Sequence, residues 1–349
     1  MKWSWVCLMS VVTTVVSLNA RAGEGTGTQA NSPRVVTLAL QPARLSDSEK
    51  FHLLPGDDGR TEGDGAALYE KAIQSIPRNL NSDQIGDWRN GPLDALPQAE
   101  VQVVLEQAKM SLDLIRQATQ CKGCNWPPFK PGTLPANLSE YRTLSSLLGV
   151  QARLAIAQRQ YDKAIETMRT GLAMARQVGE APTVVQGLVG VAMAAVVLLR
   201  VEDMAQAQGS PNLYAALQEL PRPLVDVNKP ISSELKTLES DPTYDAATRA
   251  LLQHQEEAAF ERVRILMHRQ AANVAALQCV EAVRHYAATH ENRLPPALGD
   301  MQGVAVPNDP STVRPFAYRL EGTRAILEVQ APKGGTAKDG IRYELSIAR

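Results

Sequence analysis

The pair Cys121-x-x-Cys124 is the feature of this sequence whose residue types and spacing point most directly to chemistry. Two cysteines at this spacing can form a disulfide, act as a redox pair through a thiolate of lowered pKa, or bind zinc. A thioredoxin-like site needs a βαβ setting, whereas this pair lies between a predicted helix and a proline-rich segment. Structural zinc needs two further ligands, and Cys279 has no neighbouring Cys or His to complete a set. We therefore predict a structural Cys121–Cys124 disulfide, with a redox-active pair as the alternative and Cys279 as a small buried residue.

Pairs of carboxylate and imidazole groups are the next candidates for chemistry. Glu281 and His285 lie one helical turn apart, and so do Glu257 and Glu261. Ferritin-like dimetal sites instead use Glu and His three residues apart on two helices. Both pairs thus indicate solvated contacts on a helix surface, and we expect neither a metal nor a cofactor. H-E-x-x-H, G-x-S-x-G and phosphate-binding glycine loops are also absent from the sequence, which gives no catalytic residue to predict.

Residues 1–22 have the features of a secretory signal peptide. Lys2 supplies a positive charge, residues 3–18 carry none, and Ala20-Arg21-Ala22 places small residues two apart before Gly23. We predict cleavage between Ala22 and Gly23, and the retained anchor helix is the alternative. The apolar run is shorter than the ~20 residues that span a bilayer. The mature protein is then secreted or periplasmic, in an oxidising compartment where disulfides persist.

The composition narrows the class of protein further. The chain of 349 residues carries 36 basic and 37 acidic side chains, and apolar residues make up 44% of it. The near-zero net charge is not that of a nucleic-acid-binding protein. The apolar fraction is too high for a disordered chain. A folded, mainly α-helical protein is expected.

Helical patterns dominate the first two thirds of the mature chain. Residues 66–76 and 100–119 each predict one helix, and further helices follow from Ser139 and after a turn at Arg159-Gln160. The segment 182–207 is apolar nearly all round, which is typical of a helix in the middle of a bundle. Its uncharged core is only 13 residues long. We therefore expect no stable membrane span after signal cleavage.

The last third of the chain changes character. A long helix is predicted from Asp241 to about His290, followed by three short strands at 316–320, 325–329 and 342–347. A sheet this small needs a helix over one face, and the second half of the long helix is the natural cover. The predicted organisation is a flexible lead-in at 23–34, an irregular helical bundle at 35–240, and a long helix with a small antiparallel sheet at 241–349. A short β-prone run at 35–40 opens the bundle.

Residues 148–176 resemble one tetratricopeptide unit. The small and large packing positions of such a unit are matched by Ala152, Ala155, Tyr161, Ala164, Met168 and Gly171. Arg159 stands where a turn glycine is usual. The resemblance implies two antiparallel helices that interlock where side chains are small. Since only one unit is clear, we expect a single such hairpin within an irregular bundle.

The chain from Ala275 to its last residue, Arg349, resembles type II secretion pseudopilins and type IV pilin-like proteins. The helix ending Arg284-His-Tyr286, the motif Arg293-Leu-Pro295 and the motif Pro315-Phe-Ala-Tyr318 carry this likeness. It implies a helix, a loop and a small antiparallel sheet in this order. The prepilin cleavage signature is absent from residues 1–22, so the likeness implies local fold and not pilus assembly.

The whole chain resembles secreted helical bacterial proteins of uncharacterised function, in which a Cys-x-x-Cys-x-Trp segment, here ending at Trp126, precedes a helical hairpin. That resemblance implies no activity. We expect a non-catalytic scaffolding or protein-interaction role in the cell envelope, with an envelope protein as partner. Two alternatives stay open: a thiol oxidoreductase using Cys121 and Cys124, and a protein that binds a small apolar ligand between the 182–207 helix and its neighbours.

The first prediction concerns the amino terminus. Protein recovered from the envelope of cells expressing the full chain should begin at Gly23, which intact-mass spectrometry measures directly. Replacing both Ala20 and Ala22 by arginine should abolish the cleavage, because signal peptidase requires small residues at these positions. Recovery of the uncleaved chain from unsubstituted protein would instead support the retained anchor.

Overall fold

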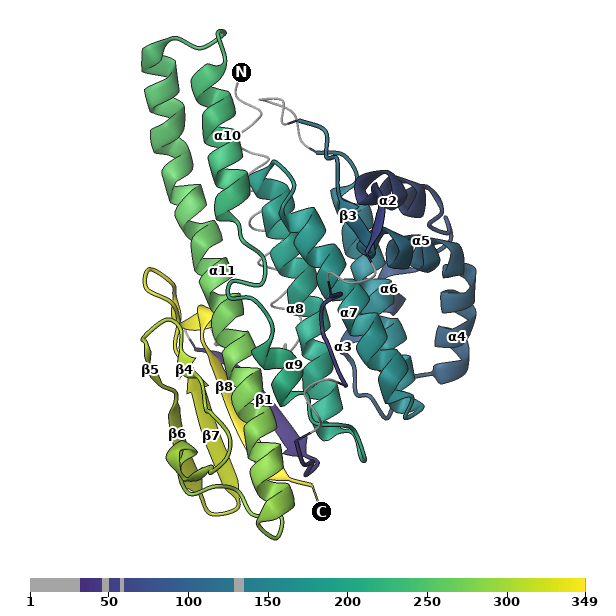
Figure 1. Cartoon of the computed structure of the whole chain (residues 1–349), viewed down its shortest axis with the longest axis vertical. Coiled ribbons are helices and arrows are strands. Elements are labelled where there is room, and N and C mark those ends of the chain that lie inside the picture. The colour runs from purple at the N-terminus through teal and green to yellow at the C-terminus, as the bar shows by residue number, and fades with distance from the viewer. Residues whose placement is uncertain (1–31, 46–49, 57–59, 129–134, 349) are drawn as a thin grey trace.

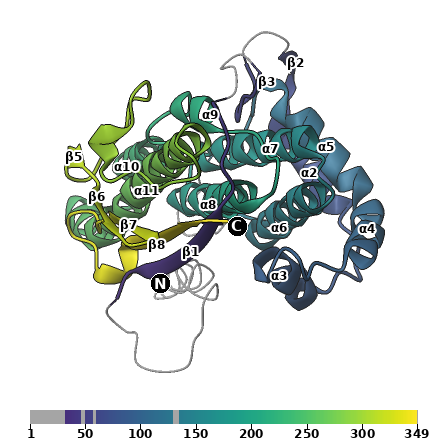
Figure 2. The ribbon, with the colours of Figure 1, turned by 90° about the horizontal axis from the view of Figure 1, so that it is seen from below.

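The computed structural model describes residues 32–45, 50–56, 60–128 and 135–348 of the chain. Helices make up most of it, as the sequence predicts. Figure 1 shows a group of shorter helices on one side and a long helix with a small sheet on the other. Viewed from below, in Figure 2, helix α8 lies between the two groups.

The first part of the chain forms a short strand and then several short helices. Its elements are β1 (Arg34–Leu40), β2 (Thr61–Asp64), α2 (Gly65–Gln74), α3 (Ser82–Asn90), α4 (Gln98–Gln107), α5 (Lys109–Thr119) and β3 (Cys121–Gly123). The prediction of one helix over 100–119 is wrong, because the chain bends at the buried Ala108. The first half then packs on α6 and the second on α2 and α7. The apolar repeat continues through the bend, so periodicity alone does not reveal it.

Three consecutive antiparallel helices form the centre of the bundle: α6 (Leu138–Ala157), α7 (Tyr161–Gly179) and α8 (Val184–Gln206). The turn between α6 and α7 holds Arg159 at a positive φ of 57°, the left-handed conformation that glycine adopts most easily. Helices α7 and α8 approach closely at two glycines. A Cβ on Gly190 would lie 2.5 Å from the Ala175 carbonyl oxygen and 2.6 Å from the Gly179 Cα. A side chain at Gly190 would therefore push the two helices apart.

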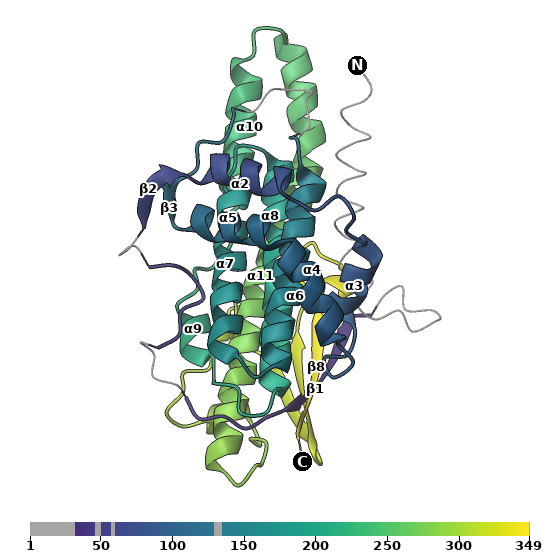
Figure 3. The same ribbon diagram turned by 90° about the vertical axis from the view of Figure 1, so that its right-hand side faces the viewer.

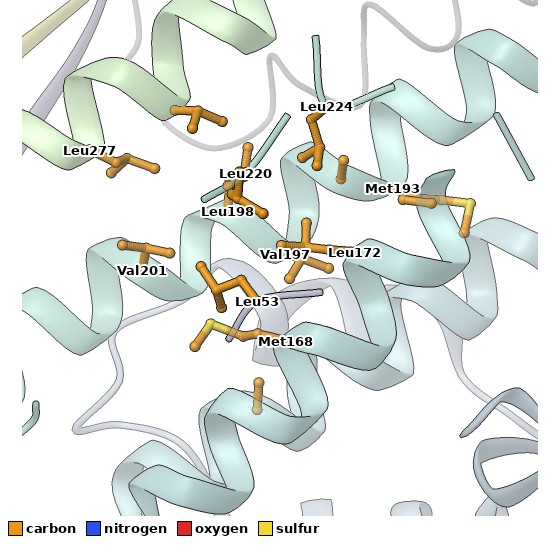
Figure 4. Close-up of a cluster of buried hydrophobic side chains, with 14 of the residues drawn as sticks. Leu53, Met168, Leu172, Met193, Val197, Leu198, Val201, Leu220, Leu224 and Leu277 are labelled. Atoms are coloured by element: carbon orange, nitrogen blue, oxygen red, sulfur yellow. The ribbon is translucent and has the colours of Figure 1, made fainter. Parts of the chain in front are cut away.

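Helix α8 is the centre of the hydrophobic core, as its composition predicts. Figure 4 shows Val197, Leu198 and Val201 of this helix among buried side chains from α7, from the 220–224 loop and from Leu277. Among the described residues, α8 is also the one helix that is long and apolar enough to cross a membrane, and 78% of its most apolar window is buried. That degree of burial is the property of a core helix.

The chain then forms a short helix and a long helical hairpin. These are α9 (Tyr214–Gln218), α10 (Asn228–Ser240) and α11 (Ala246–Thr289). The long helix is confirmed, and its 44 residues extend for about 66 Å. Figure 3 shows the far end of α10 and α11 projecting beyond the rest of the protein.

The predicted strands β6 (Ala317–Glu321), β7 (Arg324–Val329) and β8 (Ile341–Ile347) form an antiparallel meander. A two-stranded ladder of β4 (Asn308–Asp309) and β5 (Arg314–Pro315) precedes it. The expectation of a purely antiparallel sheet is wrong, because β1 pairs with β8 in parallel and the strand order is β1-β8-β7-β6. The alternation of apolar and polar residues within β8 shows which face of the strand is buried. It does not show which strand pairs with the edge of β8 opposite β7. Helices α8 and α11 cover the buried face.

A buried ion pair lies where these parts meet. The side chains of Glu281 and Arg284, both on α11, are 0% exposed, and the guanidinium donates to the carboxylate at 2.8 and 2.9 Å. Arg284 also donates to the carbonyl oxygens of Gln41, Ser210 and Pro211. One side chain thus fixes the segment after β1 and the loop after α8 against the long helix.

The Glu281 carboxylate of this pair also makes a hydrogen bond outside the pair. Glu281 accepts a hydrogen bond from the backbone N–H of Leu213 at 2.8 Å. The Asn212 amide donates to the Glu281 carbonyl and to the Ala43 carbonyl. Burying charges is costly unless such additional bonds are made. This network therefore ties residues 41–43, 210–213 and α11 together.

A second ion pair fastens the sheet to α11. Asp339, before β8, accepts two hydrogen bonds from Arg262 at 2.8 and 2.9 Å and one from the Thr336 N–H. Burial by itself would raise the pKa of this carboxyl group. The bonds from Arg262 and Thr336 outweigh burial and lower the pKa. The ionised form is thereby favoured, and the contact links the sheet to the long helix.

The second prediction tests the ion pair on α11. Replacing Arg284 by methionine should lower the free energy of unfolding by about 3–5 kcal/mol, because Glu281 is left buried without its counter-charge. The double variant R284M/E281L should cost less than the sum of the two single variants, since no charge is then left unpaired. Urea unfolding measures these differences. Arg293→Met, in an exposed pair with Glu291, is the control and should change stability little. Strict additivity would contradict the coupling.

Candidate ligand-binding groove

The structure places Cys121 and Cys124 beside helix α2 as separate thiols. Cys121 is buried in β3 and Cys124 is half-buried after it. Their sulfur atoms lie close to Gly63 and Gly65, where an added Cβ would be 3.1 and 2.7 Å away. No bond joins the two sulfurs in the structure, which therefore does not support the predicted disulfide.

The surroundings of Cys124 do not activate a thiol. Burial, followed by the nearby Asp64 carboxylate, raises the pKa of Cys124 to about 12. Burial likewise raises the pKa of Cys279 to about 12. A redox-active cysteine needs the opposite shift, because the thiolate is the nucleophile. The environment of Cys124 is thus unfavourable for thiol exchange.

An aromatic cluster with one glutamine covers the cysteine segment. The rings of Tyr69 and Trp126 stack with 6.0 Å between centroids, and Tyr141 meets both edge-on. The Trp126 indole N–H donates to the Gln177 carbonyl oxygen at 3.0 Å, and the Tyr69 hydroxyl bonds to the Gln177 side chain. These contacts hold the segment on α2 and α7 and give it a structural role.

The expected solvated pair of Glu281 and His285 is wrong, because Glu281 is fully buried in the ion pair with Arg284. His285 accepts a hydrogen bond from the Leu45 N–H at 3.2 Å, and burial lowers its pKa. Glu257 and Glu261 are exposed, as expected. The periodic pattern does not reveal this difference, since one exposed and one buried face of a long helix can carry the same residue types. Among the described residues, no group of three His, Cys, Asp or Glu side chains could hold a metal ion.

A groove of about 840 Å³ lies between α3, α6 and α8. This volume is in the range of small-molecule sites. One wall is α8, which contributes the half-buried Ala192, Val196 and Leu199 and the buried Met193. The opposite walls are Ile85 of α3 and a polar stretch of α6. This stretch consists of Arg142, Thr143, Ser145 and Ser146.

The α8 wall follows directly from the sequence of that helix. Four of its residues are half-buried at a spacing of three, one and three positions, which is one face of a helix: Ala192, Ala195, Val196 and Leu199. The remaining faces of the helix are in the core. A helix apolar nearly all round therefore leaves an apolar strip wherever protein does not cover it.

The polar wall contains an arginine without a partner. Arg142 is half-buried, and its Nε is enclosed with no hydrogen-bond partner among the described residues. Burial lowers the pKa of Arg142. Ser145, next to it on the groove wall, is buried with an unbonded hydroxyl. Buried polar groups normally have partners, and these two unbonded atoms lie side by side on the groove wall.

The other charged groups at the groove are better matched. Arg89 donates to the Ser146 hydroxyl at 2.9 Å, and both burial and the charge of Arg200 lower its pKa. Arg34 forms an ion pair with Glu202 at 3.0 Å. Asp83 and Asp87 reach the groove from α3, but both are exposed. Arg89 has no ion pair among the described residues either, but its Nε donates to the Asn90 side chain, whereas the Nε of Arg142 has no hydrogen-bond partner.

A second cavity of about 700 Å³ lies at the carboxyl end of α3, and the buried arginines there have a structural explanation. Arg153 donates to the carbonyl oxygens of Trp88 and Gly91, and Arg200 donates to that of Arg89. Asp203 pairs with both guanidinium groups. Cations at the carboxyl end of a helix are stabilising, so these residues cap α3.

The sequence pattern predicts an apolar ligand beside segment 182–207, and this segment forms one wall of the first groove as helix α8. The pattern does not identify Arg142 or Ser145 as residues of the site. These two are unremarkable by type, since surface helices are rich in arginine and serine. Ala22 and Gly23, at the predicted cleavage site, lie outside the described residues.

Comparisons of the chain with protein-family models, with curated proteins and with solved structures give no match.

The third prediction concerns the thiols. Mass spectrometry without reductant, on protein from an oxidising compartment, tests whether the disulfide predicted from the sequence forms between Cys121 and Cys124. After reduction, iodoacetamide should label native Cys124 about tenfold or more slowly than an unfolded cysteine at pH 8, because the raised pKa leaves little thiolate. Cys279, which is more deeply buried and whose pKa burial also raises to about 12, is the internal control, and labelling in urea should remove the difference. Rapid labelling of native Cys124 alone would favour the redox alternative.

Proposed function

We propose that the protein is exported to the cell envelope and acts there without catalysis, by binding a partner in the groove between α3, α6 and α8. The observation that carries the proposal is the groove itself. It combines half-buried apolar residues of α8 with Arg142, whose Nε has no hydrogen-bond partner among the described residues. Export is supported by the signal-like residues 1–22.

The remaining candidates for chemistry support a binding role. Glu281 is saturated by Arg284 and the Leu213 N–H, and Asp339 by Arg262 and Thr336. The thiol oxidoreductase alternative has no such support, since burial raises the pKa of Cys124. The side chains that could react are therefore used to hold the fold together.

Two local likenesses fit the same proposal. In the TPR-like hairpin, the positions matched by Ala164, Met168 and Gly171 are buried, and a Cβ on Gly171 would lie 2.6 Å from Val197. In the pilin-like segment, α11 leads through a loop to β6–β8, and the Tyr318 hydroxyl donates to the Pro295 carbonyl oxygen at 2.8 Å. Both likenesses belong to protein classes that work by association.

The fourth prediction tests the binding role. A photoreactive amino acid placed at Leu199, on the groove wall, should crosslink to a specific species in envelope preparations. The same group at Val103, which is 58% exposed on α4, is the matched control and should not. Ala192→Trp, which fills the groove, should abolish the adduct at position 199, because the partner is displaced.

The same adducts at both positions would contradict the assignment to the groove. Loss of specificity together with turnover of a substrate by the purified protein would overturn the non-catalytic role.

A further inference from the structure

The geometry points to a medium-chain fatty-acid carboxylate as the occupant of the groove, with its chain along α8 and its acid group at Arg142. This inference rests on the proposed binding role of the groove and names the ligand class.

The direction of the chain follows from how α6 and α8 run. Helix α7 is antiparallel to α8, since Gly179 meets Gly190 while Gly171 meets Val197. Helix α6 is joined to α7 by a tight turn and is antiparallel to it, so α6 and α8 run parallel. Gly149 of α6 faces Val196, at 3.1 Å from an added Cβ. Arg142, two turns earlier on α6, therefore lies toward the Ala192 end of the strip.

The length of the strip sets the length of the chain. Ala192 to Leu199 covers seven residue steps of α8, or about 10 Å. An extended hydrocarbon advances about 1.3 Å per bond, so a chain of about eight to ten carbons covers this distance. Arg34, which also lines the groove, is already paired with Glu202, one turn beyond Leu199 on α8.

The charge at the groove sets the headgroup. Arg142 carries one positive charge with no counter-ion among the described residues, and Ser145 offers an unbonded hydroxyl beside it. A carboxylate carries one negative charge and two oxygens, which match a guanidinium and a hydroxyl donor. An alcohol would leave the guanidinium without a counter-charge, and an ammonium would repel it.

The test is calorimetry of the purified protein with three ligands of equal chain length: decanoate, 1-decanol and decyltrimethylammonium. Decanoate should bind with one molecule per chain, and the alcohol and the ammonium about tenfold or more weakly, because a charge-assisted hydrogen bond is lost. Equal affinity for decanoate and decanol would overturn the inference.

Variants of the arginine locate the headgroup. Arg142→Ala should weaken decanoate about tenfold and leave decanol unchanged, and Arg142→Lys should keep part of the affinity because it keeps the charge. Arg78→Ala, an exposed arginine outside the groove, is the control and should bind as the unsubstituted protein does. Circular dichroism checks folding. If the alanine variant does not fold, two measurements still test the position of the headgroup. These are decanoate binding to Arg142→Gln and binding of the three ligands to the unsubstituted protein.

The outcomes separate the two proposals. A specific peptide or a second copy of the chain crosslinked at Leu199, with no binding of decanoate, overturns the fatty-acid inference and leaves the proposed binding role standing. Decanoate binding that is insensitive to Arg142→Ala overturns the inference as well. Absence of both the adduct and decanoate binding overturns both proposals.

Discussion

The ion pair of Glu281 and Arg284 is the contact on which the arrangement of the other elements depends. It joins the segment after β1, the loop after α8 and the long helix at one buried point. A buried pair offsets its desolvation cost only when both partners find further hydrogen bonds, and here backbone groups from all three segments provide them. The path of residues 41–43 past Arg284 fixes where β1 ends, and with it the parallel pairing of β1 with β8.

Helix α8 connects this polar junction to the groove. Its carboxyl end carries Glu202, which bonds to Arg34 of β1 and Tyr343 of β8, so the helix is anchored to the sheet. Its middle packs so closely on α7 that glycine is required at Gly190. With its position fixed on these sides, the strip from Ala192 to Leu199 faces the gap beside α3 and α6. The same apolar composition thus supplies both the core and the wall of the candidate site.

The contacts of the buried and half-buried arginines separate those that hold the fold together from the one at the proposed site. Arg153, Arg200, Arg262 and Arg284 all form ion pairs or donate to backbone carbonyls, and each stabilises a junction between elements. Arg142 differs because it forms no such ion pair or bond to a backbone carbonyl among the described residues, and its Nε has no hydrogen-bond partner. An arginine kept half-buried without a counter-ion costs stability. A ligand that supplies the missing charge would recover that cost, which is the physical basis for placing the site here.

The sequence by itself determined the elements with strong local patterns: the hairpin of α6 and α7 with its turn at Arg159, the core helix α8, the long α11 and the strands β6–β8. Apolar periodicity and turn residues fix these locally, because each depends on neighbours a few positions away. Only the tertiary structure decided the bend at Ala108, the parallel pairing of β1 with β8, the burial of Glu281 and the isolation of Arg142. Each of these depends on contacts between residues that are distant in the chain. A residue's type and spacing do not say whether such a distant partner is present.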